Sequence, residues 1–209
     1  MVKADVIVFD MDGVLVDVRA SYRDCIIATV AQITGGPTVT HEQIQEYKNR
    51  GGFNNDWLLT QTAAKDLGTQ VSYEEAVQLF NELFYETYMQ REKWIPSAGF
   101  LQRLADRAPL YIFTGRQNEE ARITLRRFAA TQYFTDVIGD EDVAHAKPAP
   151  DGLLDIQDRH PGKQLLYLGD TVDDARSAEA AGVPFVGVGS ESGASVVITD
   201  IHELENLLS

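Results

Sequence analysis

Val6-Ile7-Val8-Phe9-Asp10-Met11-Asp12-Gly13 is the stretch of this chain that decides its fold. The four apolar residues at its start, three of them β-branched, are typical of a short strand that is buried on both faces of a sheet. Two aspartates follow directly, with one residue between them, and Gly13 permits a sharp turn of the backbone. The stretch therefore predicts a buried strand that delivers carboxylates to one edge of a sheet.

The next segment, residues 19–91, has helical periodicity throughout. Gly35-Gly36-Pro37 ends a first helix, and Thr40-His41-Glu42-Gln43 and Ser72-Tyr73-Glu74-Glu75 have the form of capping boxes that begin later ones. After the first helix we expect helices over residues 41–48, 56–67 and 73–91. The apolar residues of the 56–67 helix that we expect to face inward are Trp57, Leu58 and Leu67.

Strands and helices alternate from residue 95 onward. The expected strands are 110–113, 136–138, 165–168, 185–188 and 196–198. The expected helices are 98–107, 118–130, 150–159, 173–181 and 201–208. Such alternation indicates a parallel sheet with helices on both faces. The predicted fold class is α/β: residues 1–16 and 95–209 form a doubly wound parallel sheet with its helices, and residues 17–94 form an inserted all-helical domain.

Composition limits the classes of partner. Among 209 residues, 18 are Lys or Arg and 32 are Asp or Glu, which gives a formal net charge of −14. Nucleic acids and anionic membranes are bound through clustered positive charge, so neither is an expected partner. The single cysteine, Cys25, excludes an internal disulfide, and no apolar run approaches the ~18 residues that span a bilayer. With no visible signal peptide, we expect a cytoplasmic protein.

Chemically active side chains follow the strands at their carboxyl ends, where open parallel sheets bind ligands. These residues are Asp10, Asp12, Thr114, Gly115, Arg116, Lys147, Asp170, Asp173 and Asp174. Carboxylate oxygens suit Mg²⁺, whereas a hydroxyl, backbone N–H groups and a lysine suit a phosphoryl group. Repulsion among so many acids is a further reason to expect a divalent cation and a lysine between them.

Four ordered motifs resemble those of the haloacid dehalogenase-like superfamily. They are Asp10-Met11-Asp12-Gly13-Val14, Thr114-Gly115-Arg116, Lys147-Pro148 and Gly169-Asp170-Thr171-Val172-Asp173-Asp174. Each motif alone is compatible with an ordinary turn or helix cap, but the four together, in the family's order, favour the resemblance. The helical insert is similar to the cap domain of the branch that contains phosphoglycolate phosphatase and β-phosphoglucomutase.

The resemblance implies that Asp10 and Asp12 carry the reaction. Asp10 would be the nucleophile that forms an aspartyl-phosphate. Asp12 would protonate the leaving group and then activate water. Mg²⁺ would be held by the Asp10 carboxylate, the Asp12 carbonyl oxygen and Asp170.

The other motif residues would bind and support the phosphoryl group. The resemblance implies that Thr114 and the Gly115 N–H would bind its oxygens. Lys147 would neutralise the charge that develops beside the nucleophile. Asp174 would hold Lys147 or a metal-bound water, and Asp173 is the alternative for that role.

Two groups of residues have open interpretations. Arg116 is placed either for a phosphate contact or for a solvated surface. The polar loop of residues 48–55 would read the substrate as in the family's caps, or it is an ordinary turn between helices. Arg19 lies where such a cap would meet the core, or it packs in a hinge. The candidate substrate residues of the cap are Arg19, Lys48, Arg50, Gly52 and Asn54.

The leading hypothesis is a Mg²⁺-dependent phosphatase of a small phosphorylated metabolite, such as phosphoglycolate or a sugar phosphate, acting as a monomer or homodimer. A phosphomutase similar to β-phosphoglucomutase is the alternative, although no histidine closely follows the first motif. Asp12 disfavours a dehalogenase and a phosphonatase, whose leaving groups need no such acid. A phosphorylatable receiver domain without enzymatic activity is less favoured, because receivers lack a long helical insert.

Overall fold

The computed structural model describes residues 2–53, 55–189 and 193–208. The chain divides into two compact units, of which unit 1 comprises Met1–Val16 and Trp94–Ser209 and unit 2 comprises Asp17–Lys93. The second boundary lies one residue before the position expected from the sequence. The chain leaves unit 1 at β2 (Val16–Asp17) and returns at β3 (Lys93–Trp94), and these short strands pair with each other.

Unit 1 is built on a six-stranded sheet in the order β5-β4-β1-β6-β7-β8. Its strands are β1 (Val6–Phe9), β4 (Leu110–Phe113), β5 (Asp136–Ile138), β6 (Leu165–Gly169), β7 (Phe185–Val188) and β8 (Val197–Ile198). Neighbouring strands are parallel throughout. The predicted α/β class with a doubly wound parallel sheet is confirmed.

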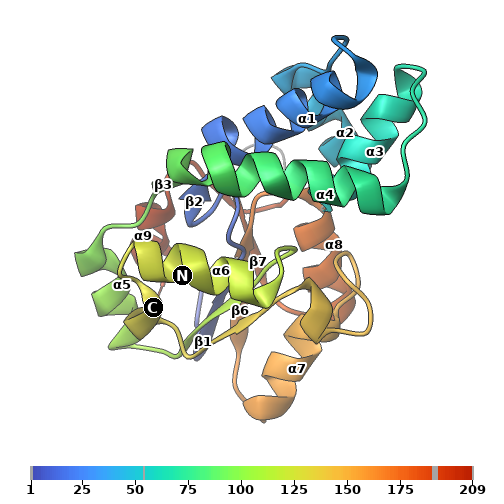
Figure 1. Cartoon of the computed structure of the whole chain (residues 1–209). Helices are drawn as coiled ribbons and strands as arrows, with labels where there is room; N and C mark the ends of the chain where they lie inside the picture. Colours follow the sequence, from blue (N-terminus) through green and yellow to red (C-terminus); the bar gives the residue numbers. More distant parts are fainter. Residues whose placement is uncertain (1, 54, 190–192, 209) are drawn as a thin grey trace. The chain divides into compact units, whose positions relative to one another are not determined.

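Helices cover both faces of this sheet. They are α5 (Ala98–Ala105), α6 (Asn118–Arg127), α7 (Asp151–Arg159), α8 (Val172–Ala181) and α9 (Leu204–Leu207), with 3₁₀ turns at Thr131–Tyr133, Asp140–Asp142 and Ile201–Glu203. Leu153 and Ile156 of α7 and Ala178 of α8 share one buried cluster with Val8 and Tyr167 of the sheet. α5 and α6 lie on the opposite side (Figure 1).

The strand order brings the motif residues to one edge. β1 lies between β4 and β6, and its last residue, Phe9, is paired with both neighbours. Continuing this register places Asp10, Thr114 and Asp170, which follow the three strands, at the same edge. The direction of chain progression reverses at β1, and doubly wound sheets bind ligands outside the carboxyl ends of the strands at such a point.

Unit 2 is helical. Its elements are a π-helix at Arg19–Arg23, α1 (Asp24–Thr34), α2 (His41–Arg50), α3 (Asp56–Asp66), α4 (Tyr73–Leu83), a π-helix at Phe84–Tyr88 and a 3₁₀ turn at Met89–Arg91. α1, α3 and α4 pack against one another. Two predicted helix ends are confirmed. Gly35 ends α1 in the left-handed conformation, and Thr40 begins α2 with a full capping box that includes Gln43.

The expected helix over residues 73–91 does not continue as one α-helix. α4 ends at Leu83, and a π-helix and a 3₁₀ turn follow. The change of pitch begins at Phe84, whose buried ring lies 4.4 Å from that of Tyr22 between centroids. A π turn changes the direction of the side chains that follow it, so helical periodicity alone did not predict this segment.

The inward orientation expected for Leu58 and Leu67 is wrong. These side chains are 38% and 40% exposed. The buried face of α3 is instead made of residues at helical spacing, which are Leu59, Thr60, Ala63 and Ala64. Leu58 lies off this face, whereas its neighbour Leu59 is fully buried in it.

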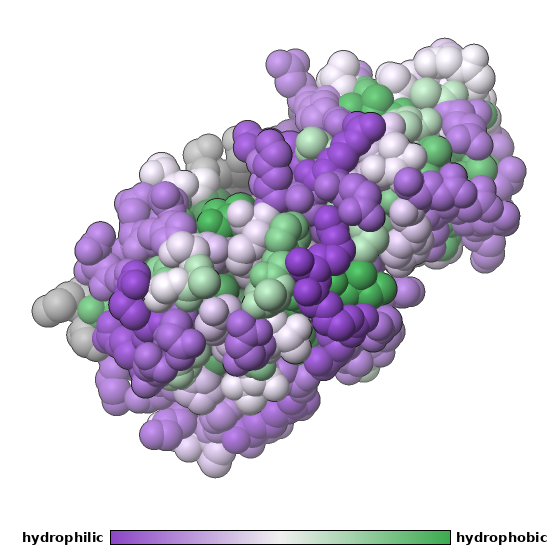
Figure 2. All heavy atoms as spheres, turned by 60° about the vertical axis from the view of Figure 1, so that its left-hand side comes forward, coloured by the Kyte–Doolittle hydropathy of each residue, from purple (hydrophilic) through white to green (hydrophobic). Residues whose placement is uncertain are grey.

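Hydrophilic residues cover most of the face shown in Figure 2, and hydrophobic ones occupy small separate areas. The large hydrophobic residues exposed in the described part of the chain are Leu58, Leu67, Tyr85, Ile95, Leu154, Val196 and Val197. Within the same described part, no helix combines the length and the apolar character that crossing a membrane requires.

Candidate active site

Asp10 and Lys147 form a buried ion pair at the carboxyl edge of the sheet. Asp10 follows β1 and is 5% exposed, and Lys147 is 7% exposed. The Lys147 Nζ donates one hydrogen bond of 2.7 Å to Asp10 Oδ1 and another of 2.6 Å to Asp174 Oδ1. One ammonium group therefore lies between two buried carboxylates.

Asp174 is fixed by several donors besides Lys147. The Tyr167 hydroxyl donates to Oδ1 at 2.6 Å, and Thr171 donates to Oδ2 through its N–H at 3.0 Å and its hydroxyl at 2.7 Å. Thr171 is the N-cap of α8 and forms a capping box with Asp174. Of the two candidates, Asp173 and Asp174, it is Asp174 that the structure brings to Lys147.

Burial and charge set the protonation of this cluster. Desolvation raises the pKa of Asp10 to about 7, against the attraction of Lys147. Burial opposes the charge on Lys147, but Asp10 and Asp174 hold its pKa above the ordinary value. Burial likewise opposes the charge on Asp174, but Lys147 and Thr171 keep its pKa below the ordinary value. A second cation beside Asp10 would favour its ionised form.

Oxygen atoms suited to a metal ion lie beside this pair. Asp10, Asp170 and Asp174 each offer a carboxylate oxygen, and these atoms lie within 4.8 Å of one another. Both oxygens of Asp174 already accept hydrogen bonds, so Asp10 and Asp170 are the better placed ligands. A Cβ at Gly13, where φ is +79°, would lie 2.0 Å from Asp170 Oδ2, so only glycine leaves room for that carboxylate. Hard oxygen donors of this kind fit Mg²⁺.

Thr114 and Gly115 follow β4 at the same edge. Thr114 is buried, and its N–H donates to the Ile138 carbonyl of β5 at 3.0 Å. Its hydroxyl accepts a hydrogen bond of 3.2 Å from the Arg116 N–H. The turn after β4 thus holds a hydroxyl and a half-buried glycine at the end of the strand next to β1.

Arg116 lies buried at the site, so its interpretation as a solvated surface residue is wrong. The residue is 4% exposed. Its Nε and Nη2 donate to Asp12 Oδ1 at 2.9 and 2.5 Å, and its Nη1 donates to Thr124 Oγ1 at 2.9 Å. Asp12, whose side chain is 27% exposed, therefore has a buried cationic partner. The two residues are 104 positions apart, and no local sequence signal identifies the pair.

Comparison with protein families decides which group of enzymes carries this arrangement. The model of the haloacid dehalogenase-like hydrolase family matches residues 4–182. The chain belongs to this hydrolase family. The matched region includes all four motifs, so the expected family is confirmed and the protein is an enzyme of the hydrolase class.

Individual relatives of this hydrolase differ in how much of their length it spans. An imidazoleglycerol-phosphate dehydratase from Phytophthora nicotianae is 30% identical over 196 residues, which cover 87% of this chain but only 42% of that protein. A phosphoglycolate phosphatase from Rhodobacter capsulatus is 27% identical over a region that covers 88% of this chain and 83% of that protein. A subfamily IA hydrolase of the same superfamily from Geobacter sulfurreducens is 25% identical in sequence, and its crystal structure matches with a TM-score of 0.72. The match covers 98% of this chain and 100% of that chain.

Two of the candidate cap residues of this hydrolase form ion pairs within unit 2. Arg19 donates to the Asp17 carboxylate through its N–H, Nε and Nη2, which lowers the pKa of Asp17 to about 2. The Lys48 Nζ lies 3.0 Å from Asp56 Oδ1, and both side chains are largely buried. Another candidate, Asn54, lies outside the described residues.

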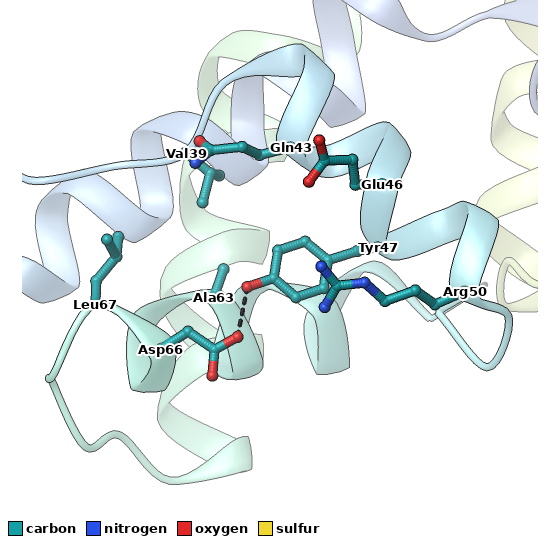
Figure 3. Close-up of a pocket in the computed structure, with 8 residues that line it drawn as sticks. All are labelled: Val39, Gln43, Glu46, Tyr47, Arg50, Ala63, Asp66 and Leu67. Carbon is teal, nitrogen blue, oxygen red and sulfur yellow. Dashed lines mark hydrogen bonds between the residues drawn. The ribbon is translucent and has the colours of Figure 1, made fainter.

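Arg50 lines a small pocket of about 220 Å³ in unit 2 (Figure 3). Its guanidinium lies 5.1 Å from the centre of the Tyr47 ring, and the Tyr47 hydroxyl donates to Asp66 at 2.6 Å. The loop expected over residues 48–55 begins later, because α2 continues to Arg50 and Gly51 caps it. Lys48 and Arg50 therefore belong to a helical turn, and Gly52, with φ of +80°, belongs to the loop.

Tyr167 is a site residue that sequence reasoning missed. Its position inside an apolar strand assigns it to the core, and it is fully buried. A buried tyrosine hydroxyl needs a polar partner, and this tyrosine lies on the strand that leads to Asp170. That combination is the signal that could have placed it beside Asp174 in advance.

Proposed function

We propose that this hydrolase is a Mg²⁺-dependent phosphatase that acts on a small phosphorylated metabolite through an aspartyl-phosphate on Asp10. The observation that carries the proposal is the position of Lys147, between Asp10 and Asp174 and at the edge where Asp170 offers a metal ligand. A buried carboxylate with a fixed cation and a second acid nearby has what phosphoryl transfer to a protein side chain requires.

In the first step Asp10 attacks phosphorus, and the bond between phosphorus and the ester oxygen breaks. The proton of Asp12 passes to the departing oxygen, so the alcohol leaves as a neutral molecule. Lys147 offsets the charge beside Asp10, and Thr114 and Gly115 bind the phosphoryl oxygens.

In the second step water attacks the phosphorus of the aspartyl-phosphate. The electron pair of the broken bond returns to the Asp10 carboxylate, and Asp12 accepts the proton that the water loses. Both aspartates then have their starting protonation. When held by Asp10, Asp170 and the Asp12 carbonyl oxygen, Mg²⁺ supplies positive charge that offsets the repulsion between the nucleophile and the phosphate.

We further propose that the substrate is phosphoglycolate-like or a sugar phosphate. Phosphoglycolate phosphatases are among the relatives that match most of this chain and most of their own length. A net charge of −14 opposes an anionic substrate at long range, so the metal ion and Lys147 must supply the attraction locally. The substrate-reading role of Arg19, Lys48, Arg50 and Gly52 and the cytoplasmic location also belong to this proposal.

The test is phosphate release from phosphoglycolate and from a set of hexose and pentose phosphates, with Mg²⁺ and with EDTA. We expect Mg²⁺-dependent release from a few of these esters and its loss in Asp10→Asn. Conversion of a sugar phosphate into its isomer without phosphate release would instead establish a phosphomutase. Full activity of Asp10→Asn would contradict the proposed nucleophile.

A further inference from the structure

We propose that Arg116 is a positioning residue for the acid–base chemistry of Asp12. Its guanidinium holds Oδ1 of Asp12, so that the other carboxylate oxygen, Oδ2, is the one that exchanges protons with the ester oxygen and with water. This inference rests on the proposed function, because Asp12 acts as an acid and base only if phosphate esters are hydrolysed.

The contact geometry fixes one oxygen of Asp12 and not the other. Both Nε and Nη2 of Arg116 donate to Oδ1, at 2.9 and 2.5 Å. Two N–H groups on one edge of a planar guanidinium converge on this single oxygen and restrain its position. Oδ2 receives no hydrogen bond from Arg116, and the Asp12 side chain keeps 27% of its surface exposed. The carboxylate is thus held from one side and open on another.

Arg116 is itself held by α6. Its Nη1 donates to the hydroxyl of Thr124, a residue that is 1% exposed. The Arg116 side chain is 2% exposed, so the guanidinium has little freedom to leave this position. A long side chain that is immobilised in this way has lost its rotamer entropy on folding, before any substrate binds.

The backbone around Arg116 is also fixed. The Arg116 carbonyl oxygen accepts a hydrogen bond of 2.9 Å from the Asp140 N–H. A Cβ at Gly139 would lie 2.8 Å from that oxygen and 2.5 Å from the Asn118 nitrogen, so the loop after β5 packs directly on the loop after β4. The side chain and the backbone of Arg116 are therefore both held in place. If the Asp12 carboxylate rotates, the guanidinium cannot move with it.

The test compares two substrates that differ only in their need for an acid. An alkyl phosphate must receive a proton as its alcohol leaves, whereas nitrophenolate leaves from p-nitrophenyl phosphate as a stable anion. The ratio kcat/KM reports the steps up to departure of the leaving group. It is measured for both esters with wild type, Arg116→Met, Arg116→Lys, Thr124→Val and Asp12→Asn, using the alkyl phosphate that wild type hydrolyses best.

We expect Arg116→Met to lower kcat/KM for the alkyl phosphate by roughly 10- to 100-fold, because general acid catalysis contributes about 10²- to 10⁴-fold. For p-nitrophenyl phosphate we expect a decrease of less than about 3-fold, since no acid is needed. Asp12→Asn removes the acid itself, so it should show the largest difference between the two esters. Thr124→Val, which removes only the hydroxyl that holds Nη1, should show a smaller difference in the same direction.

An equal decrease for both esters would overturn the inference and assign Arg116 to phosphate binding or to stability alone. No decrease for either ester would overturn it as well. If Arg116→Met does not fold, Arg116→Lys is judged by the same criterion, because lysine keeps the charge but not the paired donors. Absence of phosphate release by wild type from both esters would contradict the proposed function rather than the role of Arg116.

Discussion

Lys147 and Arg116 are two buried cations, and each holds a carboxylate of the first motif in place. Lys147 joins Asp10 to Asp174, and Arg116 joins Asp12 to α6. The motif pattern was enough to predict that a lysine would lie beside the nucleophile. It was not enough to predict the partner of Arg116, because a contact across 104 positions depends on how the sheet brings two loops together.

Tyr167→Phe tests the support of Lys147 and Asp174 at the residue scale. The substitution removes one buried hydroxyl, which donates to Asp174 Oδ1 at 2.6 Å, and leaves the ring in place. We expect a loss of about 2 kcal/mol in the free energy of unfolding, measured with urea, because the buried hydrogen bond to the carboxylate is lost together with the one that the hydroxyl accepts from Lys147 at 3.2 Å. We also expect a lower kcat with little change in KM, because Lys147 is less firmly held.

Tyr111→Phe is the matched control. Tyr111 is a mostly buried tyrosine of the neighbouring strand β4, and its hydroxyl lies 2.8 Å from His160 Nε2. This change should also lower stability, by about 1 kcal/mol, and leave kcat unaltered. Equal effects of the two substitutions on kcat would show that Tyr167 has no particular connection with the site.

At the scale of elements, the sequence predicts strands better than it predicts the cap helices. The strands at 110–113, 136–138 and 185–188 have the predicted bounds, because short apolar runs between Pro, Gly and Asp leave few alternatives. The π-helix after Leu83, where the ring of Phe84 packs on that of Tyr22, was not predictable in this way. The exposure of Leu58 was not predicted either, because helical periodicity did not distinguish it from Leu59, which lies on the buried face of α3.

Asp136 offers a test at the same scale, because it connects an edge strand to two helices. At the start of β5 it accepts hydrogen bonds from Arg122 of α6 at 2.7 Å and from Arg159 of α7 at 2.9 Å. Burial opposes its charge, but these donors and the Val137 N–H hold the pKa of Asp136 below the ordinary value. We expect Asp136→Asn to lower the free energy of unfolding by about 1 kcal/mol at neutral pH, since the carboxylate is one third exposed.

The pH dependence of that difference follows from the direction of the shift. A carboxyl group with a lowered pKa in the folded protein stabilises the fold above its unfolded pKa, and this contribution is lost as the pH falls through the folded value. The gap between Asp136→Asn and wild type should therefore shrink as the pH falls below the ordinary pKa of an aspartate, about 3.9, in urea or thermal unfolding. Asp158→Asn, which changes an exposed carboxylate of α7, serves as the control. A gap that stays constant with pH would contradict the assigned ion pairs.

At the scale of the whole molecule, the charge balance makes a bound cation important. The chain has a formal net charge of −14, and several of its carboxylates meet at one edge of the sheet. Lys147 already lies between Asp10 and Asp174, and a bound metal ion would offset the repulsion that remains. Metal binding and stability should for that reason be coupled in the whole chain.

We expect Mg²⁺ to raise the temperature of thermal unfolding in a saturable way. A ligand that binds only the folded state stabilises it by about 2.7 kcal/mol when its concentration is 100 times Kd. Asp170→Asn should abolish the shift, because Asp170 offers one of the metal ligands. Asp173→Asn, a change at a buried aspartate of the same motif, should keep it. A shift that survives in Asp170→Asn would place the cation elsewhere.

The most direct test of the proposed chemistry is to locate the phosphoryl group on the enzyme during turnover. Wild type and Asp12→Asn are each mixed with p-nitrophenyl phosphate and Mg²⁺. Both are then quenched in acid, digested and analysed by mass spectrometry. In Asp12→Asn we predict one phosphoryl group on the peptide that contains Asp10. Phosphorylation by this ester needs no acid, whereas hydrolysis of the aspartyl-phosphate has lost its base. Phosphate release by wild type, with no phosphoryl group found on Asp10 in either protein, would contradict the aspartyl-phosphate mechanism.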